Sequence, residues 1–523
     1  MWDAHSATGI VIGLALFVIF VSGALVLFRG EIRQWEEPRL RSSPGERASL
    51  DALTGPVLDS LKAGDSPPSH IQVGLPDAPG GSLYMYVAGG TVGGPQSVWV
   101  NPTTGRWVTN PDEGAATQTL YYLHFFYQFG RWGMYLVGLI GLFMLLAITT
   151  GTAVHLNRIV KDAFQFRPSK ALRVAWADAH KVLGTIGLPF QAMYAFTGAY
   201  LGLLALLALP YASLLFGGSA ADFYRATGHY APSVSVDSVE VMPTASPSLE
   251  RLATQAETKW PRFEPKTMIV SKRGQPDSRV EIIGRTRGTV FAGTGSIVFH
   301  GATGEVLLQR PPSEAGMFND VVQSTEVLHF ATFGGSALKI LFLLLTLASS
   351  AVILTGNFTW LEVRRKQDRM LHTILARLTA GVATGMAPAL ALLFLSARWK
   401  PDGLPSPDGW TDLVFFGSWG LGVVYALARP NIARTHRALL TLGGLLALLI
   451  PLANGFTTGA WPWIPWAAQQ WSVFGVDVGA VLSGLALLGL AACLNVEAVP
   501  SDGGKRSAGV VPSLKVARTS RHS

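Results

Sequence analysis

The chain has 523 residues and a formal net charge of +8, with 49% hydrophobic and only 14% charged residues. Soluble proteins carry about 25% charged residues. This composition therefore excludes a soluble enzyme, a disordered chain and a fibrous protein, and it predicts an integral membrane protein. The single cysteine, Cys493, excludes a disulfide framework and a cysteine-ligated cluster, so any metal chemistry must use histidine or carboxylate ligands.

Eight stretches of about 20 apolar residues, the length that crosses a bilayer, predict eight transmembrane helices. The first four are placed at residues 1–28, 131–155, 182–216 and 336–360, and the other four lie within 376–495. Two long polar segments, 29–130 and 217–335, contain short strand-like runs among many Gly, Pro, Ser and Thr residues. They are predicted to form two small domains outside the membrane, and the tail, 496–523, is expected to be disordered.

The distribution of lysine and arginine predicts the orientation of the chain, because cytoplasmic loops carry an excess of both. Six occur in residues 155–181, five in 360–377, three in 429–437 and five after residue 494, whereas 396–411 has two and 457–471 has none. Both termini and the basic loops 156–181 and 361–375 are therefore expected in the cytoplasm. The two long polar segments would face the periplasm, with the helices in a bacterial inner membrane. Because the positive charge clusters beside hydrophobic segments, we expect no nucleic-acid partner.

The first 360 residues contain an internal repeat of helices. One pair of motifs, Asp3-Ala4-His5 and Ser22-Gly23-Ala24, recurs 175 residues later as Asp178-Ala179-His180 and Thr197-Gly198-Ala199. A second pair, Leu123-His124-Phe125 and Thr150-Gly151, recurs 205 residues later as Leu328-His329-Phe330 and Thr355-Gly356. The recurring glycines allow either close helix packing or room for a flat cofactor, and the sequence does not distinguish these uses.

The polar segments repeat as well, since a strand followed by a glycine-bearing turn occurs at Val98–Gly105 and again at Ile297–Gly304. The predicted unit is a helix, an outer domain and a second helix, present twice in parallel orientation. Parallel repeats imply a pseudo-two-fold axis along the membrane normal. Residues related by this axis can meet across it and build a shared site.

Four histidines are anchors of the repeat and are predicted to pair across the axis. His5 and His180 begin the first and third helices on the cytoplasmic side, and His124 and His329 precede the second and fourth helices on the outer side. Neutral imidazole is a strong axial ligand of haem iron, and a low-spin, electron-transferring haem can be held by two histidines. The symmetry predicts an outer haem on His124 and His329 and an inner haem on His5 and His180.

His155, at the cytoplasmic end of the second helix, competes for the inner haem because it lies at the same depth as His180. His124 and His155 are 31 residues apart, about 46 Å along a continuous helix, so they cannot bind one iron. Single histidines at helix ends are often ordinary interfacial residues. Six histidines remain: His70, His229 and His300 are expected to be solvated loop residues, His372 and His436 to contact lipid head groups, and His522 to lie in the tail.

Features of other membrane proteins are missing from the sequence. No Asp or Glu lies in the middle of a predicted helix, although proton-coupled and cation transporters normally have one there. Neither a G-x-G-x-x-G motif nor a P-loop is present, so the chain encodes no nicotinamide, flavin or ATPase module. Electrons would have to come from a separate cytoplasmic donor or from quinol.

The duplicated D-x-H…[ST]-G-A and L-H-F…T-G helices, the turn Asn101–Gly105 and the run His155–Pro168 resemble the PepSY-associated transmembrane family. Its members include iron-uptake proteins of bacterial inner membranes, among them ferrioxamine-type siderophore reductases. The resemblance covers about residues 1–365. It implies two periplasmic PepSY-like regions and non-covalent haem b, about two per chain. The candidate ligands are five histidines, and the pairing at the inner haem stays open: His5, His124, His155, His180 and His329.

The predicted fold is an integral membrane, mainly α protein with eight transmembrane helices, whose first four form a duplicated helix–periplasmic α+β PepSY-like domain–helix unit. The resemblance implies a reductase that passes electrons to ferric iron in a periplasmic siderophore. Reduction would release the metal, because Fe(II) is a weaker partner for hard oxygen ligands. Two alternatives remain, a haem-free membrane regulator or sensor and a transporter of iron or siderophore, and the missing intramembrane carboxylates count against the transporter.

Overall fold

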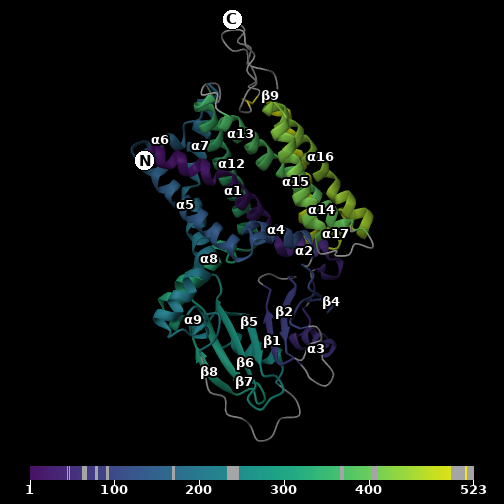
Figure 1. Ribbon diagram of the computed structural model, residues 1–523. Helices are drawn as coiled ribbons and strands as arrows, with labels where there is room; N and C mark the ends of the chain where they lie inside the picture. Colours follow the sequence, from purple (N-terminus) through teal and green to yellow (C-terminus); the bar gives the residue numbers. More distant parts are fainter. Residues whose placement is uncertain are drawn as a thin grey trace, which may run out of the picture.

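The computed structural model describes the chain except residues 44, 46, 62–67, 77–80, 90–93, 113, 168–170, 233–246, 292, 366–369, 400, 402–408, 496–512 and 515–523. The molecule is elongated, with a helical region at one end and a β-sheet at the other (Figure 1). We call the end of the helical region next to the sheet the sheet side and the opposite end, where the N-terminus lies, the far side. The tail predicted to be disordered lies outside the described residues, apart from Ser513 and Leu514.

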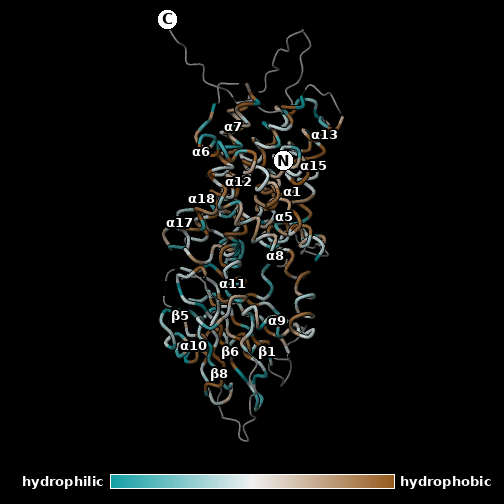
Figure 2. Tube along the Cα trace, turned by 90° about the vertical axis from the view of Figure 1, so that its left-hand side faces the viewer, coloured by the Kyte–Doolittle hydropathy of each residue, from teal (hydrophilic) through white to brown (hydrophobic). Residues whose placement is uncertain are grey.

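Among the described residues, seven helices are long and apolar enough to cross a bilayer, and an eighth span results if two segments of α8 that meet at 59° count as one. The chain is therefore a multi-pass membrane protein, and Figure 2 shows hydrophobic residues along these helices. The helices are α1 (Trp2–Val26), α5 (Arg131–His155), α8 (Leu188–Leu215), α12 (Gly335–Val363), α13 (Met370–Thr379) with α14 (Met386–Arg398), α15 (Trp410–Ala428), α16 (Ile432–Thr458) and α18 (Trp471–Cys493).

The first four spans pack together in an arrangement that follows the internal repeat. α1 contacts α5 and α12, α5 contacts α8, and α12 contacts α7 (Leu172–Ile186), which α8 continues after Gly187. The repeated first helices are thus α1 and the α7–α8 pair, and the repeated second helices are α5 and α12. Where α5 crosses α8, a Cβ added to Gly202 would lie 2.6 Å from the backbone nitrogen of Gly138, so this crossing requires glycine.

Shorter helices connect the membrane region to the sheet and the loops. They are α2 (Arg29–Glu36), α4 (Ala116–His124), α6 (Ile159–Ala163), α9 (Ala220–Ala226), α11 (Met317–Phe330) and α17 (Trp463–Ala467), with 3₁₀ turns at Pro38–Leu40, Tyr127–Phe129, Leu156–Arg158 and Pro312–Glu314. α4 and α11 are equivalent in the repeat, and each is followed by a left-handed residue, Phe126 and Ala331, both with φ 53°. Gly130 then precedes α5 and Gly335 begins α12, with φ 58° and 61°, a conformation that glycine adopts readily.

Eight strands form one antiparallel sheet in the order β4-β3-β2-β1-β5-β6-β7-β8. The strands are β1 (His70–Gly74), β2 (Leu83–Ala88), β3 (Gln96–Val100), β4 (Trp107–Thr109), β5 (Phe263–Ser271), β6 (Arg279–Thr286), β7 (Gly295–His300) and β8 (Val306–Arg310), and a two-stranded pair joins β9 (Leu494–Asn495) to β10 (Ser513–Leu514). Residues of α3 (Leu50–Ser60) and α10 (Leu249–Glu257) and alternating strand residues share a single hydrophobic core.

This sheet differs from the predicted pair of separate small domains. Segments 29–130 and 217–335 each contribute four strands, and they join where β1 pairs with β5, with His70 opposite Ser271 and Gly74 opposite Thr267. Each four-stranded unit alone would expose the backbone groups of an edge strand at this position. Pairing of the two edges satisfies these groups, so the two repeats share one extramembrane domain.

The repeated turn predicted after a strand is present in both copies. Gly105 N–H donates to the Asn101 carbonyl at 3.0 Å and Gly304 N–H donates to the His300 carbonyl at 2.8 Å. Both glycines have positive φ, 68° and 76°. His300 Nδ1 accepts a hydrogen bond from Ala302 N–H at 3.1 Å, and the residue is only 4% exposed. The expectation that His300 is a solvated loop residue is therefore wrong, because its ring closes a buried turn.

The four C-terminal spans pack beside α1 and α2, and a π-helical turn, Ala380–Thr384, joins α13 to α14. Trp35 of α2 is fully buried in this contact. Its indole N–H donates to Asp477 of α18 at 2.8 Å, and Asn454 of α16 donates to the same carboxylate at 3.1 Å. The Arg398 guanidinium lies 3.8 Å over the Trp35 ring. This set of side chains attaches the C-terminal helices to the duplicated half at the sheet side.

Candidate functional site

The four histidines of the repeat meet as two pairs. The ring centroids of His124 and His329 are 6.1 Å apart, with an angle of 38° between the rings. The centroids of His5 and His180 are 6.0 Å apart, with an angle of 61°. The first pair lies at the ends of α4 and α11 on the sheet side, and the second lies on the far side in α1 and α7. Each pair takes one histidine from each half of the repeat.

The spacing of each pair fits one metal atom between two rings. Metal–imidazole bonds of about 2 Å separate the two ligand nitrogens by about 4 Å, and the ring centroids by about 6 Å. The described residues contain no group of three or more His, Cys, Asp or Glu that could hold a bare metal ion. Two protein ligands leave the remaining coordination to another group, as the macrocycle of a haem does.

Hydrogen bonds at Nδ1 orient three of these histidines. The Nδ1–H of His5 donates to the Ala147 carbonyl at 2.9 Å, that of His180 to Val352 at 2.8 Å and that of His124 to Ile19 at 3.0 Å. A proton on Nδ1 leaves Nε2 of a neutral ring with a free lone pair, which is the form that binds a metal. Nε2 of these histidines forms no hydrogen bond within the described part of the chain.

Glycine makes room for the same three rings. Gly151, Gly356 and Gly23 each lie four residues after the carbonyl that accepts the histidine proton. A Cβ on these glycines would lie 2.8 Å from Cε1 of His5, 3.0 Å from Cε1 of His180 and 2.7 Å from Cε1 of His124. Three of the recurring glycines therefore make room for histidine rings, a use that the sequence does not indicate.

His329 makes a different contact. Its Nδ1 lies 2.9 Å from the hydroxyl oxygen of Thr197, and a Cβ on Gly198 would lie 3.9 Å from its Cε1. The Tyr194 ring packs against His329 with centroids 5.2 Å apart, and its hydroxyl donates to the His329 carbonyl at 3.2 Å. The sheet-side pair is therefore asymmetric in its hydrogen bonds.

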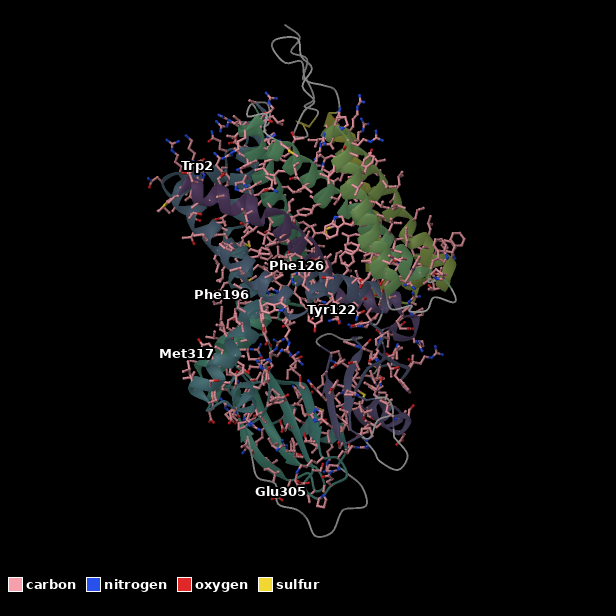
Figure 3. The ribbon with its side chains drawn as sticks, viewed as in Figure 1. Trp2, Tyr122, Phe126, Phe196, Glu305 and Met317 are labelled. Atoms are coloured by element: carbon pink, nitrogen blue, oxygen red, sulfur yellow. The ribbon has the colours of Figure 1, made fainter. Side chains whose placement is uncertain are left out.

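His155 lies on the far side but is not a member of the pair. Its Nδ1 is 3.0 Å from a carboxylate oxygen of Asp162, and its ring packs edge-on against Trp2, with centroids 6.0 Å apart. Figure 3 places Trp2 at the end of the bundle remote from the sheet. Of the two candidates for a partner of His180, the structure places His5 opposite it and leaves His155 as a third histidine of that end.

Two further histidines lie inside the C-terminal region. His372 and His436 are only 6% and 4% exposed, so the expectation of contact with lipid head groups is wrong. His372 Nε2–H donates to the Leu361 carbonyl at 2.8 Å, and His436 Nδ1 lies 2.6 Å from the Thr384 hydroxyl. His229, in the sheet-side segment, pairs with Glu326 at 3.1 Å and is not a free loop residue.

An aromatic cluster adjoins the sheet-side pair and was not predicted from the sequence. Ring centroids of Tyr121 and Phe125 are 4.8 Å apart, and those of Tyr122 and Tyr127 are 4.9 Å apart. Figure 3 places Tyr122 where the helices meet the sheet. The run Tyr121–Tyr127, with six aromatic or imidazole rings in seven residues, is the signal that could have indicated it.

An ion-pair cluster beside these rings ties α2 to the sheet and to α4. Asp112 accepts from Arg33 at 2.7 Å and from Arg29 at 2.5 Å. The Arg33 guanidinium lies 3.6 Å over the Trp99 ring of β3, and that of Arg29 lies 3.9 Å over Tyr121 of α4. Burial acts to raise the pKa of Asp112, but Arg33 and Arg29 outweigh burial and hold this pKa below its ordinary value.

Comparison with known proteins covers the duplicated half. The model of the PepSY-associated TM region matches residues 2–362. An uncharacterized protein of Pseudomonas aeruginosa is 28% identical over an alignment of 368 residues that covers 68% of this chain and 89% of that protein. The family match ends before α13, so the C-terminal spans lie outside it.

Proposed function

Because the chain belongs to the PepSY-associated transmembrane family, we propose that it is a haem-containing reductase of a bacterial inner membrane, which passes electrons to ferric iron in a periplasmic siderophore complex. The observation that carries this proposal is the presence of two facing histidine pairs, one at each side of the membrane region, with centroids 6.0 and 6.1 Å apart. Electron transfer across a bilayer requires two separate redox sites, and we call each histidine pair with its proposed haem a station.

In this proposal His124 with His329 and His5 with His180 each hold one haem b, about two per chain. Haem bound by two histidines supplies a one-electron carrier. The chain holds each imidazole as a neutral ligand through its Nδ1 hydrogen bond, orients it against the neighbouring helix, and sets the potential of the site through burial and hydrogen bonding. His155, beside the far-side pair, is the remaining candidate ligand from the family resemblance.

The charge pattern supports an orientation with the far side and both termini in the cytoplasm and the sheet in the periplasm. Electrons would enter at the far side from a cytoplasmic donor or from quinol. They would leave at the sheet side, where the aromatic cluster Tyr121, Tyr122, Phe125 and Tyr127 adjoins His124. The substrate step adds one electron to Fe(III) of the chelate and gives Fe(II), which hard oxygen ligands hold less tightly.

The test is the absorption spectrum of the detergent-purified full chain, oxidised and then reduced with dithionite, with haem quantified per chain. The proposal expects about two haems per wild-type chain, and about one after His124→Ala or His329→Ala. Unchanged haem content in both variants would exclude the sheet-side assignment. A colourless wild-type protein, expressed with full haem supply, would favour the haem-free regulator, and uptake of iron into proteoliposomes without an electron donor would favour a transporter.

A further inference from the structure

Thr197 is the one repeat position at which a histidine contact departs from the shared pattern. By the repeat offset, His329 should donate to the Tyr194 carbonyl, as His124 donates to the Ile19 carbonyl at 3.0 Å. Its Nδ1 instead lies 2.9 Å from the Thr197 hydroxyl oxygen. The equivalent residue in the first copy is Ser22, whose hydroxyl donates to the Val18 carbonyl at 2.6 Å. There, the group that accepts from His124 is the peptide carbonyl of Ile19.

The roles in this hydrogen bond follow from the other contact of Thr197. Its hydroxyl donates to the Met193 carbonyl at 2.9 Å, so the oxygen is available to accept from Nδ1–H of His329. Nε2 of His329 is then unprotonated, as in the other three histidines. What differs is the acceptor, since an aliphatic hydroxyl draws the Nδ1 proton less strongly than a peptide carbonyl does.

The position of the His329 ring is held by a second residue. Tyr194 packs against the ring at 5.2 Å and donates its hydroxyl to the His329 carbonyl at 3.2 Å. The ring also stands farther from its glycine, since a Cβ on Gly198 would lie 3.9 Å from Cε1, against 2.7 to 3.0 Å at the other three sites. Thr197 and Tyr194 thus together define the position of the His329 ring.

We propose that Thr197 is a positioning residue that weakens electron donation from His329 to its metal. This makes the sheet-side station more oxidising than the far-side station. The difference favours electron movement toward the sheet. The proposal rests on the proposed haem-binding function. A strong acceptor at Nδ1 raises the basicity of the imidazole and stabilises the oxidised metal, so a weaker acceptor favours the reduced metal. Both far-side histidines donate to peptide carbonyls, Ala147 and Val352, and only the sheet-side pair contains the weaker contact.

The test is a potentiometric titration of the full chain in detergent, followed by haem absorption. Wild-type protein should show two separate transitions, and the His5→Ala variant, which keeps only the sheet-side haem, should retain the one at higher potential. In that background Thr197→Val removes the acceptor and should raise the Fe(II)/Fe(III) ratio at a fixed potential by roughly fivefold to tenfold, where tenfold corresponds to about 59 mV. Thr197→Ser restores the hydroxyl and should restore the potential.

Ser22→Ala is the matched control, because it removes the equivalent hydroxyl without removing a histidine contact, and it should leave both potentials unchanged. An unchanged potential in Thr197→Val, an equal shift in Ser22→Ala, or a sheet-side potential at or below the far-side one would overturn the inference. If Thr197→Val loses its haem, Thr197→Cys keeps the size with a weaker acceptor, and an unshifted potential there has the same meaning. Absence of haem from wild-type protein is a different result, since it defeats the proposed function itself.

Discussion

The two ends of the duplicated bundle hold their histidines at the same spacing in different surroundings. On the far side, His5 and His180 both donate to helix carbonyls and both lie against glycine. On the sheet side, His124 follows this pattern, whereas Nδ1 of His329 contacts the side-chain hydroxyl of Thr197 at 2.9 Å. The ring spacing, 6.0 and 6.1 Å, is the same at both ends. Duplication thus preserves the ring spacing of a shared site, while the Nδ1 contact of one histidine differs.

The ends also differ in what they anchor. On the sheet side, Asp112 joins two arginines of α2 to the sheet and to α4. On the far side, Asp178 accepts two bonds from Arg167, at 2.7 and 2.9 Å, and holds the loop before α7. Asp178 is 1% exposed. The partly exposed Asp112 carboxylate therefore ties α2 to the sheet at one end, and the buried Asp178 carboxylate pairs with Arg167 at the other.

The strongest prediction concerns the glycines beside the two sheet-side histidines. Gly23 lies close to the His124 ring, whereas Gly198 lies farther from the His329 ring. Gly23→Ala should abolish haem binding at the sheet side and reduce haem to about one per chain, because its Cβ would lie 2.7 Å from Cε1 of His124. Gly198→Ala is the matched control and should keep both haems, because the corresponding distance to His329 is 3.9 Å. The pyridine haemochrome assay measures the haem content per chain of both variants and tests this difference. Equal haem content in the two variants would show that the glycines do not serve the rings.

The next effect concerns the attachment of the C-terminal helices, which the buried Asp477 carboxylate secures at the sheet side. Asp477→Ala removes the acceptor of the Trp35 indole N–H and leaves the Asn454 amide only its longer bond to the Ala460 carbonyl. We expect a loss of about 3 kcal/mol in the free energy of unfolding, measured as a lower melting temperature in detergent. Trp463→Ala, at a residue 65% exposed, should change it little. A melting temperature unchanged by Asp477→Ala would mean that apolar packing alone holds the region.

A smaller effect is expected at the ion-pair cluster. Asp112→Asn should destabilise the sheet-side junction by about 2 kcal/mol at neutral pH. Because the folded-state pKa of Asp112 is lowered, its stabilisation is present above the unfolded value near pH 4 and is lost as the pH falls through the lower folded value. The melting temperatures of wild type and variant should therefore converge below about pH 4. A difference independent of pH would point to a steric cause.

The smallest expected effect is at His155. His155→Ala should leave about two haems per chain, because the His180 ring faces His5 and His155 contacts Asp162 and Trp2. His5→Ala is the comparison and should lose the far-side haem. Both variants need only a haem quantification and a reduced spectrum. If the losses were reversed, His155 would be the far-side ligand and the symmetry of the two ends would be broken.

Much of this architecture could be predicted from the sequence because it depends on local properties. Apolar length predicted the membrane helices, and a span predicted at 131–155 corresponds to α5. The repeat offsets predicted which histidines face each other. The union of β1 with β5 could not be predicted, because strand pairing across about 200 residues leaves no local signal. The burial of His372 and His436 was missed for a similar reason, since it depends on how the C-terminal helices pack.

The membrane character, the duplication and the set of histidines follow from composition, period and motif, and all three can be read along the chain. The partner of each imidazole follows from the folded bundle: a helix carbonyl for His5, His124 and His180, and a hydroxyl for His329. A hydrogen bond between helices depends on their relative rotation and height to within a few tenths of an ångström. That precision comes from packing of the whole bundle, and no single segment of the chain contains it.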